Sequence, residues 1–386
     1  MPNIIHICQD EKFINSGFNQ FEKLHQNQNE IWVYDCPEKR LKHITVDISK
    51  IRFIENDSET YRLIPKDSIV VFHSLPNHVI PNLSYIDQSV RIIWCIFGFE
   101  TYSDHTIYSV NKSFDSITKK ITLTKKYSVK EDIKFVLFPY IRKFKKNLYL
   151  TIKERERLKK KEKLNNLKRV DYFATSFDEE KISQEKMLGF SRPLFNFWYY
   201  PVELILDLNQ EVNYDKSKIM IGHSGYRNGN HLDVVNKIKN YSFVNEDIII
   251  PISYGEKNYI DIIKPLITKN LPGVNFIEEF QSLDTYNNLL ANVKIAIFNN
   301  RRQQALGNII ALVFLGAKVF LSEKNSFYHY LKRIGIKIFS YENDLNSKSI
   351  ENGLSLEDIS TNRQRLYEQL NETKLLMELK ISINHV

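Results

Sequence analysis

The sequence predicts an α/β protein made of two Rossmann-like, doubly wound domains that face each other across a cleft. Two observations lead to this prediction. Short apolar runs rich in β-branched residues alternate with helix-like segments, and this alternation starts again after Pro201. Continuous apolar runs indicate parallel strands covered on both faces, and a chain of 386 residues is long enough for two domains. We place the domains at residues 1–200 and 201–386.

The first domain contains five apolar runs that we expect to form one parallel sheet. These runs are Asn3–Cys8, Glu30–Tyr34, Asp67–Phe72, Arg91–Phe97 and Tyr172–Ser176. Between the last two lies an insertion at about residues 103–169, which is polar, basic and rich in lysine. The final part of this insertion has a helical composition and no proline.

The second domain alternates more regularly, as expected for successive β-α units. The expected strands are Lys218–Gly222, Asp247–Ile252, Val274–Ile277, Lys294–Phe298 and Lys318–Leu321. The expected helices are His231–Lys239, Tyr259–Thr268, Leu283–Asn292, Gly307–Leu315 and Asn325–Arg333. A last helix, at about Leu356–Leu379, is long enough to pack back across the domain junction. Ligands of such sheets bind beyond the carboxyl ends of the strands, so functional residues are expected in the loops there.

The positive charge of the chain is concentrated in one segment. The net charge is +8, yet residues 142–169 contain thirteen basic and three acidic side chains, a net charge of +10. Because the rest of the chain is close to neutral, attraction to an acidic partner is expected at this segment.

The three cysteines, Cys8, Cys36 and Cys95, form no CxxC pair, which supports neither a disulfide framework nor a zinc ribbon. A reducing compartment fits this pattern best. The sequence also lacks an apolar run of about 18 residues and the basic start of a signal peptide. We therefore expect a cytoplasmic protein that does not span a membrane.

A glycine-rich loop, Gly222–His231, follows an expected strand and opens a helix. Glycines allow positive φ angles and close approach, and free amides at a helix start favour an anion, so the loop can cradle a phosphate. It is neither a GxGxxG motif nor a P-loop. An ordinary glycine-rich turn stays the alternative.

A second loop, Arg301–Asn308, lies between a strand and an apolar helix and carries two arginines, two glutamines and Gly307. Arginine forks and helix amides at the carboxyl end of a parallel strand are suited to holding a diphosphate. The alternative is a solvated turn, which would not require two glutamines beside two arginines.

Polar side chains also follow the strands of the first domain. Asp10 comes after the first strand, His73 ends the third, and Glu100 comes shortly after the fourth. A carboxylate at this rim could serve as a general base or orient an acceptor. The alternatives are a helix cap or ion-pair partner for either carboxylate and a buried structural role for His73.

Metal chemistry has little support in the sequence. No Asp-x-Asp, HExxH or Cys/His cluster occurs. We expect no metal and no other cofactor, so a diphosphate leaving group would depend on arginines and helix dipoles.

At these loops the sequence resembles the family of TDP-N-acetylfucosamine:lipid II N-acetylfucosaminyltransferases of enterobacterial common antigen synthesis. The resemblance is carried by Ile219–His231, Ile250–Gly255, Asp284–Leu290 and Arg302–Asn308, and in the first half by Ile5–His6, Phe72–His73 and Trp94–Tyr102. It covers residues 3–102 and about 170–335. Two departures are Ala305, where the family usually has glycine, and the longer, more basic segment at residues 103–169.

The resemblance implies a metal-independent hexosyltransferase of glycosyltransferase family 56 with the GT-B fold. Such an enzyme moves a 4-acetamido-4,6-dideoxyhexose from a TDP-sugar, with a UDP-sugar as the alternative donor, to a polyprenyl-diphosphate-linked glycan in bacterial surface polysaccharide synthesis, such as that of O-antigen or enterobacterial common antigen. It implies a peripheral place on the cytoplasmic face of the inner membrane, with residues 142–169 on the anionic surface. Nucleic acid is not an expected partner.

Site roles follow from these loops and the resemblance together. For catalysis we predict Glu100, Asp10 and Arg302, and for contacts with the acceptor or cleft His73 and Tyr102. For donor binding we predict Gly222, Ser224, Gly225, Arg227, Tyr254, Gln303, Gln304, Gly307 and Asn308. Two alternatives stay open: a nucleotide-sugar epimerase of the same fold, and a non-enzymatic basic protein that binds membranes or nucleic acid.

Overall fold

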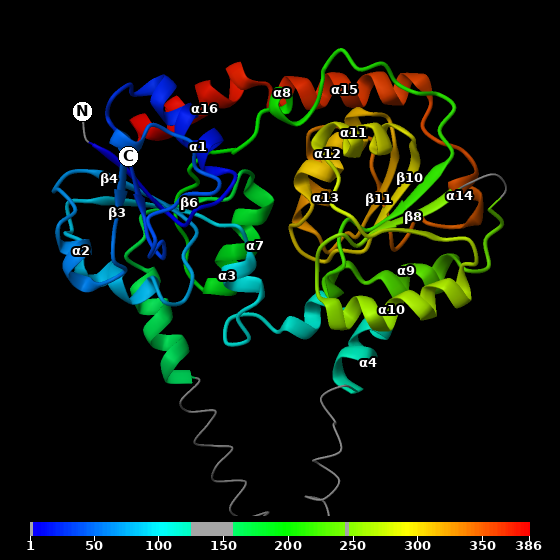
Figure 1. Ribbon diagram of the computed structural model, residues 1–386, viewed down its shortest axis with the longest axis horizontal. Coiled ribbons are helices and arrows are strands. Elements are labelled where there is room, and N and C mark those ends of the chain that lie inside the picture. Colours follow the sequence, from blue (N-terminus) through cyan, green and yellow to red (C-terminus); the bar gives the residue numbers. More distant parts are fainter. Residues whose placement is uncertain (1–2, 125–156, 244–246) are drawn as a thin grey trace, which may run out of the picture. The chain divides into compact units, whose positions relative to one another are not determined.

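The computed structural model describes residues 3–124, 157–243 and 247–386 (Figure 1). Contacts divide the described chain into two compact units. Unit 1 comprises residues 3–108, 157–201 and 371–386, and unit 2 comprises residues 109–124, 202–243 and 247–370. This division differs from the predicted domains in two segments, 109–124 and 371–386.

Unit 1 is built on a six-stranded sheet whose strands all run parallel, in the order β3-β2-β1-β4-β5-β6. The strands are β1 (Ile4–Cys8), β2 (Asn29–Val33), β3 (Ile51–Phe53), β4 (Ile69–His73), β5 (Arg91–Cys95) and β6 (Tyr172–Ala174). The α-helices of this unit that have named bounds are α1 (Ile14–Leu24), α2 (Ser58–Arg62), α3 (Phe99–Tyr102), α7 (Asp178–Leu188) and α16 (Glu372–Asn384). This strand order is that of a doubly wound sheet, and it reverses between β1 and β4.

Unit 2 repeats the same architecture, with the parallel order β12-β11-β10-β7-β8-β9. Its strands are β7 (Lys218–Ile221), β8 (Asp247–Pro251), β9 (Asn275–Ile277), β10 (Val293–Phe298), β11 (Lys318–Leu321) and β12 (Phe339–Ser340). Its α-helices are α4 (Ser116–Thr124), α8 (Val202–Ile205), α9 (His231–Ile238), α10 (Lys257–Asn270), α11 (Leu283–Ala291), α12 (Leu306–Phe314), α13 (Ser326–Arg333), α14 (Ser347–Glu351) and α15 (Leu356–Leu370). Within unit 2, Figure 1 shows α4, α9 and α10 on one face of the sheet and α11, α12 and α15 on the other. The predicted α/β class with two doubly wound sheets is confirmed.

The predicted helix Leu356–Leu379 is wrong, because two helices occupy this region. Helix α15 ends at Leu370, and Asn371 takes an extended conformation with φ −70° and ψ 151°. The Asn371 side chain then accepts a hydrogen bond of 2.9 Å from the Lys374 N–H and caps α16. Leu379 of α16 is buried in the core of unit 1, which explains why residues 371–386 belong to that unit.

The first part of the predicted insertion also belongs elsewhere than expected, since residues 109–124 pack in unit 2. The Asp233 carboxylate accepts hydrogen bonds from the backbone N–H groups of Ile117 (2.7 Å) and Thr118 (3.0 Å) and so caps α4. Ile117 and Ile121 pack against the unit 2 core on the same side. A buried carboxylate therefore fixes this segment next to α9.

Helix α12 is apolar on all sides because it is enclosed by its own unit. Its last six residues, Ile309–Phe314, are all buried, and it contacts α15, α11 and β11. A helix held in this way presents its N-terminus at a fixed place beyond the end of β10. Among the residues that the structure describes, no helix combines the length and apolar character needed to cross a membrane.

Candidate active site

The candidate site lies where the strand order of unit 2 reverses, between β7 and β10. These two strands are paired in parallel, with Ile221 beside Ile297 near their carboxyl ends. The segment that follows β7, Gly222–Asn230, is called the β7 loop below, and the segment that follows β10, Asn299–Ala305, is called the β10 loop. Open α/β sheets bind ligands at this point of reversal.

Glycines allow the β7 loop to approach the loop after β8. Gly225 and Gly255 form a parallel bridge, and the Gly225 N–H donates to the Tyr254 carbonyl at 2.7 Å. A Cβ atom on Gly255 would lie 2.3 Å from the Gly225 backbone, so neither loop can carry a larger residue here. The predicted donor residue Gly222 has φ +66°, and a Cβ there would meet the ring of His231 at 2.8 Å.

Two histidines of this region are buried and neutral. Burial lowers the pKa of His223 to about 3, and the neighbouring His231 and the positive charge of Arg302 lower it further. Burial likewise lowers the pKa of His231 to about 4. Arg302 of the β10 loop is therefore one of the groups that keep His223 of the β7 loop neutral.

Asn230 ties the two loops together. It is fully buried with φ +52°, and its side-chain amide donates to the Asn299 carbonyl at 2.7 Å and to the Ser113 carbonyl at 3.1 Å. Its side-chain oxygen accepts from the Asp115 N–H at 2.8 Å. Sequence reasoning did not identify Asn230, although an asparagine directly before a helix is a signal for a cap.

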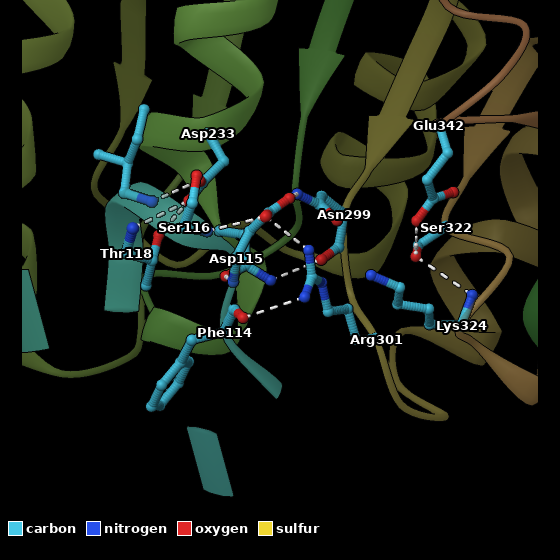
Figure 2. A network of polar contacts seen from close by, with 12 residues as sticks. Phe114, Asp115, Ser116, Thr118, Asp233, Asn299, Arg301, Ser322, Lys324 and Glu342 are labelled. Atoms are coloured by element: carbon cyan, nitrogen blue, oxygen red, sulfur yellow. Dashed lines mark hydrogen bonds and ion pairs between the residues drawn. The ribbon is translucent and has the colours of Figure 1, made fainter. Parts of the chain in front are cut away.

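The β10 loop is held by a network that Figure 2 shows from close by. The Arg301 guanidinium forms an ion pair with Asp115 at 2.6 Å and donates to the Phe114 carbonyl at 3.1 Å. The Asn299 side-chain amide donates to the same Asp115 carboxylate at 3.0 Å. Sequence reasoning considered Arg301 but missed Asp115, which lies far from it along the chain.

Buried polar atoms without a hydrogen-bond partner gather in these two loops. Six such atoms are His223 Nδ1, Asn228 Oδ1, Asn299 Oδ1, Asn300 Oδ1, Arg301 Nε and Gln303 Oε1. The side-chain amide of Asn299 donates a hydrogen bond to Asp115, and that of Asn300 donates one to the Asn228 carbonyl (3.3 Å). These two hydrogen bonds set the orientations of the two side chains. Buried polar groups normally find partners, so a cluster of exceptions indicates a ligand site.

The chemistry of these atoms indicates what kind of ligand they suit. The amide oxygens need hydrogen-bond donors such as hydroxyl or N–H groups, while Arg301 Nε–H needs an acceptor. Helix α12 starts directly after the β10 loop, and the amides of its first turn, at Gly307 and Asn308, favour an anion. A molecule that combines hydroxyl groups with phosphate satisfies both requirements.

The predicted donor residues have different surroundings in the structure. Gln303, Gln304, Gly307 and Asn308 lie in the β10 loop or the first turn of α12, and Gln304 accepts from the Asn300 amide at 3.1 Å. Arg227 instead pairs with Glu256, with 2.5 Å between its Nε and the Glu256 Oε2. Its charge is therefore compensated within the protein.

Aromatic rings extend the site along the sheet edge. The predicted Tyr254 ring is 46% exposed, and its centroid lies 6.1 Å from that of Tyr226 and 6.5 Å from that of His223. Ser224, in the β7 loop between His223 and Tyr226, is buried. Exposed rings beside a phosphate-type site can stack on a flat aromatic group of a ligand.

The loop after β11 adds a cation that sequence reasoning missed. The Ser322 hydroxyl donates to Glu342 at 2.6 Å and accepts from the Lys324 N–H at 3.3 Å, which fixes the loop backbone. The Lys324 side chain is exposed, and in Figure 2 it points toward the side of the network where Arg301 lies.

Ala305, the residue between the β10 loop and α12, has φ +61°. An L-residue in this left-handed region is strained by about 1 kcal/mol or more, whereas glycine is not. We expect Ala305→Gly to raise the free energy of unfolding by about 0.5 kcal/mol, after the entropy that glycine adds to the unfolded chain is subtracted.

Denaturant unfolding measures this difference, with Ala311→Gly as the control. Ala311 lies inside the same helix, so glycine there should lower stability by about 1 kcal/mol or more. Equal losses in both variants would contradict the strain at Ala305.

In unit 1, the predicted residue His73 is buried in a chain of hydrogen bonds. The Asn29 amide donates to Glu22, so its oxygen accepts from His6 Nε2 at 3.4 Å. It follows that His6 Nδ1 accepts from His73 Nε2 at 2.9 Å, and His73 Nδ1 from the Tyr199 hydroxyl at 2.6 Å. Burial lowers the pKa of both histidines, so they are neutral, and both ring nitrogens of His73 already have partners.

Asp10 has a structural task in unit 1. Its carboxylate accepts hydrogen bonds from the backbone N–H groups of Lys42 (2.5 Å), His43 (3.0 Å) and Ile44 (2.8 Å). Burial alone would raise the pKa of Asp10, but these three bonds lower it. An anion held in this way is a weak base.

Glu100 has the opposite environment. Its side chain is 5% exposed, burial raises the pKa of the carboxyl, and its Oε2 is a buried atom without a partner. Its Oε1 accepts long bonds from the Phe97 N–H at 3.4 Å and the Trp94 indole at 3.5 Å. The predicted Tyr102 is buried as well, and its hydroxyl donates to Glu180 at 3.4 Å. A raised pKa makes Glu100 the stronger base of the two predicted carboxylates.

The site residues thus form two groups that lie in different units. At the carboxyl edge of the unit 1 sheet lie His73, which ends β4, and Asp10 and Glu100, which follow β1 and β5. The donor residues follow β7, β8 and β10 in unit 2. In the described ranges, His, Cys, Asp and Glu side chains form no group of three or more suited to a metal ion.

Comparison with known proteins gives a family and a fold. A model of the family described as 4-alpha-L-fucosyltransferase, glycosyl transferase group 56, matches residues 124–358. The solved structure of Anabaena HepE with UDP and glucose is similar at 8% identity and a TM-score of 0.61, over 100% of both chains. Sucrose-phosphate synthase from Thermosynechococcus elongatus has 9% identity and a TM-score of 0.59, over 100% of this chain and 99% of that one. Trehalose 6-phosphate synthase from Burkholderia multivorans has 8% identity and a TM-score of 0.59, over 100% of this chain and 98% of that one. At such identities the likeness shows the fold alone, which is GT-B.

Proposed function

The chain belongs to glycosyl transferase group 56, and on this premise we propose that it transfers a 4-acetamido-4,6-dideoxyhexose from a TDP-sugar to a polyprenyl-diphosphate-linked glycan. As a member of this family, the protein is a hexosyltransferase that uses a nucleotide-sugar. We further propose that this transfer is a step in the synthesis of a bacterial surface polysaccharide, such as O-antigen or enterobacterial common antigen.

The observation that carries this proposal is the cluster of unpartnered buried atoms in the β7 and β10 loops. A nucleotide-sugar offers hydroxyl and N–H groups to the oxygens of Asn299, Asn300 and Gln303, and phosphate oxygens to Arg301. The exposed ring of Tyr254, next to the same loops, is suited to stack on the nucleotide base. UDP bound to HepE shows that a protein of this fold holds a nucleoside diphosphate.

In the proposed reaction the residues of unit 2 stabilise the leaving nucleoside diphosphate. Negative charge develops on its phosphate oxygens as the bond to the sugar breaks. Arg302 and the first amides of α12 are cationic and dipolar donors for that charge, and the unpartnered Nε–H of Arg301 is a further hydrogen-bond donor, so no ion is needed. The acceptor hydroxyl loses its proton to a base, for which we propose Glu100 of unit 1.

Turnover should therefore survive chelation. With excess EDTA we expect a rate within about twofold of the untreated enzyme, because arginines and helix amides replace the cation in this proposal. The measurement is release of nucleoside diphosphate before and after chelation. Complete loss of the rate, restored by Mn²⁺ or Mg²⁺, would refute the metal-independent mechanism.

The direct test of the proposed function is a donor screen. Full-length protein is incubated with TDP- and UDP-sugars, with and without a polyprenyl-diphosphate-linked glycan, and release of TDP or UDP is measured together with the glycan product. We expect nucleotide release that depends on the acceptor. A donor that is isomerised without any acceptor would instead show an epimerase, and no turnover with any donor would remove the proposal.

We also propose a peripheral place on the cytoplasmic face of the inner membrane, where a polyprenyl-diphosphate acceptor is found. The support is the charge of residues 142–169, of which the structure describes 157–169. Within that part, Lys163 pairs with Asp104 at 2.7 Å and Arg169 with Asp171 at 3.2 Å, so these two are structural. The side chains of Lys159, Lys161 and Lys168 are exposed and remain available to an anionic surface.

Replacing these three lysines by glutamine should weaken binding to acidic vesicles. At about 1 kcal/mol per lysine, the three together amount to roughly a hundredfold at low salt, and binding should also fall as salt rises. Co-sedimentation with vesicles that contain or lack acidic lipid measures this effect.

The matched control for the vesicle experiment replaces three exposed lysines elsewhere, Lys39, Lys269 and Lys348. Equal losses in both triple variants would indicate a general charge effect, and equal binding to neutral and acidic vesicles would exclude the membrane role. Tight binding to RNA with a similar salt dependence would favour a nucleic-acid partner instead.

A further inference from the structure

We propose that Asp115 is a positioning residue of the donor site, which acts through Arg301 and Asn299 and is supplied by the chain segment before α4. This inference rests on the proposed function, because it assumes that the β10 loop holds the donor. Asp115 lies in the polar segment that the sequence places before the second domain, and neither the motifs nor the family resemblance includes it.

Asp115 holds the β10 loop through both of its carboxylate oxygens. One carboxylate oxygen lies 2.6 Å from Arg301, and the other accepts from the Asn299 amide at 3.0 Å. Both partners come from the stretch that directly follows β10, at the point where the sheet order reverses. One carboxylate therefore fixes the side chains of two loop residues at once, as Figure 2 shows.

The Nε–H group is the part of the Arg301 guanidinium that is left for a ligand. Its two terminal nitrogens are engaged, one by Asp115 and one by the Phe114 carbonyl at 3.1 Å. Its Nε is buried and has no partner, and the same is true of Asn299 Oδ1. The segment Phe114–Asp115 thus orients both side chains so that a donor and an acceptor group stay unsatisfied within the loop.

Asp115 is itself held in place by the β7 loop. Its N–H donates to Asn230 of the β7 loop at 2.8 Å. Burial alone would raise the pKa of Asp115, but hydrogen bonds from Asn299 and Ser116 and the charge of Arg301 lower it. The carboxylate is therefore an anion with fixed partners in the β10 loop, and the backbone of the same residue is fixed to the β7 loop.

The chain offers a matched control in Asp233. Its carboxylate accepts from the N–H groups of Ile117 (2.7 Å) and Thr118 (3.0 Å) and from the Thr118 hydroxyl (2.7 Å). It anchors the same segment as Asp115, and these hydrogen bonds involve neither Arg301 nor Asn299. A variant of Asp233 loosens the segment, whereas a variant of Asp115 releases the β10 loop.

The experiment compares binding of TDP and of UDP by calorimetry to full-length wild type and to four variants. These are Asp115→Asn, Asp233→Asn, Arg301→Ala and the double variant Asp115→Asn/Arg301→Ala. We expect Asp115→Asn to weaken nucleotide binding about tenfold, the effect of one charge-assisted contact. Asp233→Asn should change it by less than about twofold, and Asp115→Asn should add little in the Arg301→Ala background, because coupled residues are not additive.

Thermal unfolding of each variant shows that it is folded, and Asp115→Glu tests rescue, since it restores the charge that Asp115→Asn removes. Unchanged binding in Asp115→Asn, an equal loss in Asp233→Asn, or full additivity with Arg301→Ala would each overturn the inference while leaving the proposed function intact. Failure of the wild type to bind either nucleotide would instead remove the proposed function, and the positioning role with it.

Discussion

Arg302→Ala is expected to lower turnover by about a hundredfold or more while the protein stays folded. Arg302 lies in the loop directly before α12, and its charge helps to lower the pKa of buried His223 in the facing loop. A guanidinium at this place stabilises the leaving diphosphate more as its charge grows. Loss of one such donor costs roughly 2 to 4 kcal/mol in the transition state.

The measurement is the rate of nucleoside diphosphate release at saturating donor and acceptor. Arg227→Ala is the matched control, because Arg227 is also an arginine of these loops but is paired with Glu256. We expect a much smaller change in turnover for this control. Near wild-type turnover in a folded Arg302→Ala variant would show that Arg302 does not stabilise the leaving group.

The central strands were predictable because they are buried on both faces. Such strands appear in the sequence as continuous apolar runs, and β1, β4, β7 and β10 match their predicted positions within one or two residues. The edge strands β3 and β12 were missed, since they have three and two residues and show no periodicity. Their pairing depends on the neighbouring strand, which the local sequence does not reveal.

The candidate site was predictable in part for a related reason. Glycines and arginines after a strand are a local signal, so both loops of unit 2 could be found from their own residues. The structural role of Asp10 could not be predicted from the sequence, because its carboxylate accepts hydrogen bonds from the backbone N–H groups of residues 42–44. Asp115 likewise gains its meaning only from Arg301 and Asn299, which the fold brings to it from a distant part of the chain.

The second large effect is expected for Glu100→Gln, which should lower turnover by about 10² to 10⁴, the usual contribution of a general base. Burial raises the pKa of this carboxyl, and Oε2 has no partner that would hold it as an anion. The ionised form that can accept a proton is therefore lost at a higher pH than for an ordinary glutamate. On the acid side, the rate of the wild type should fall as pH decreases through this raised pKa.

The same substitution should affect stability in the opposite direction. A raised pKa in the folded state means that the protonated form of Glu100 is the one that suits the fold, so its stabilising contribution is complete at low pH. That contribution decreases as pH rises through the folded-state pKa. Because glutamine cannot ionise, Glu100→Gln should be at least as stable as wild type at pH values above the folded-state pKa, and the difference should shrink as pH falls toward the unfolded-state pKa.

Turnover, donor affinity and unfolding are measured on Glu100→Gln beside Asp10→Asn as the control. Asp10 accepts three backbone hydrogen bonds as an anion, and its pKa is lowered. Asp10→Asn should therefore lose stability as its main effect and keep most of its turnover. An active Glu100→Gln variant would exclude Glu100 as the base. Replacing a base that acts on the acceptor should leave the affinity for TDP or UDP unchanged. Loss of donor binding in Glu100→Gln would therefore indicate that Glu100 contributes to nucleotide binding.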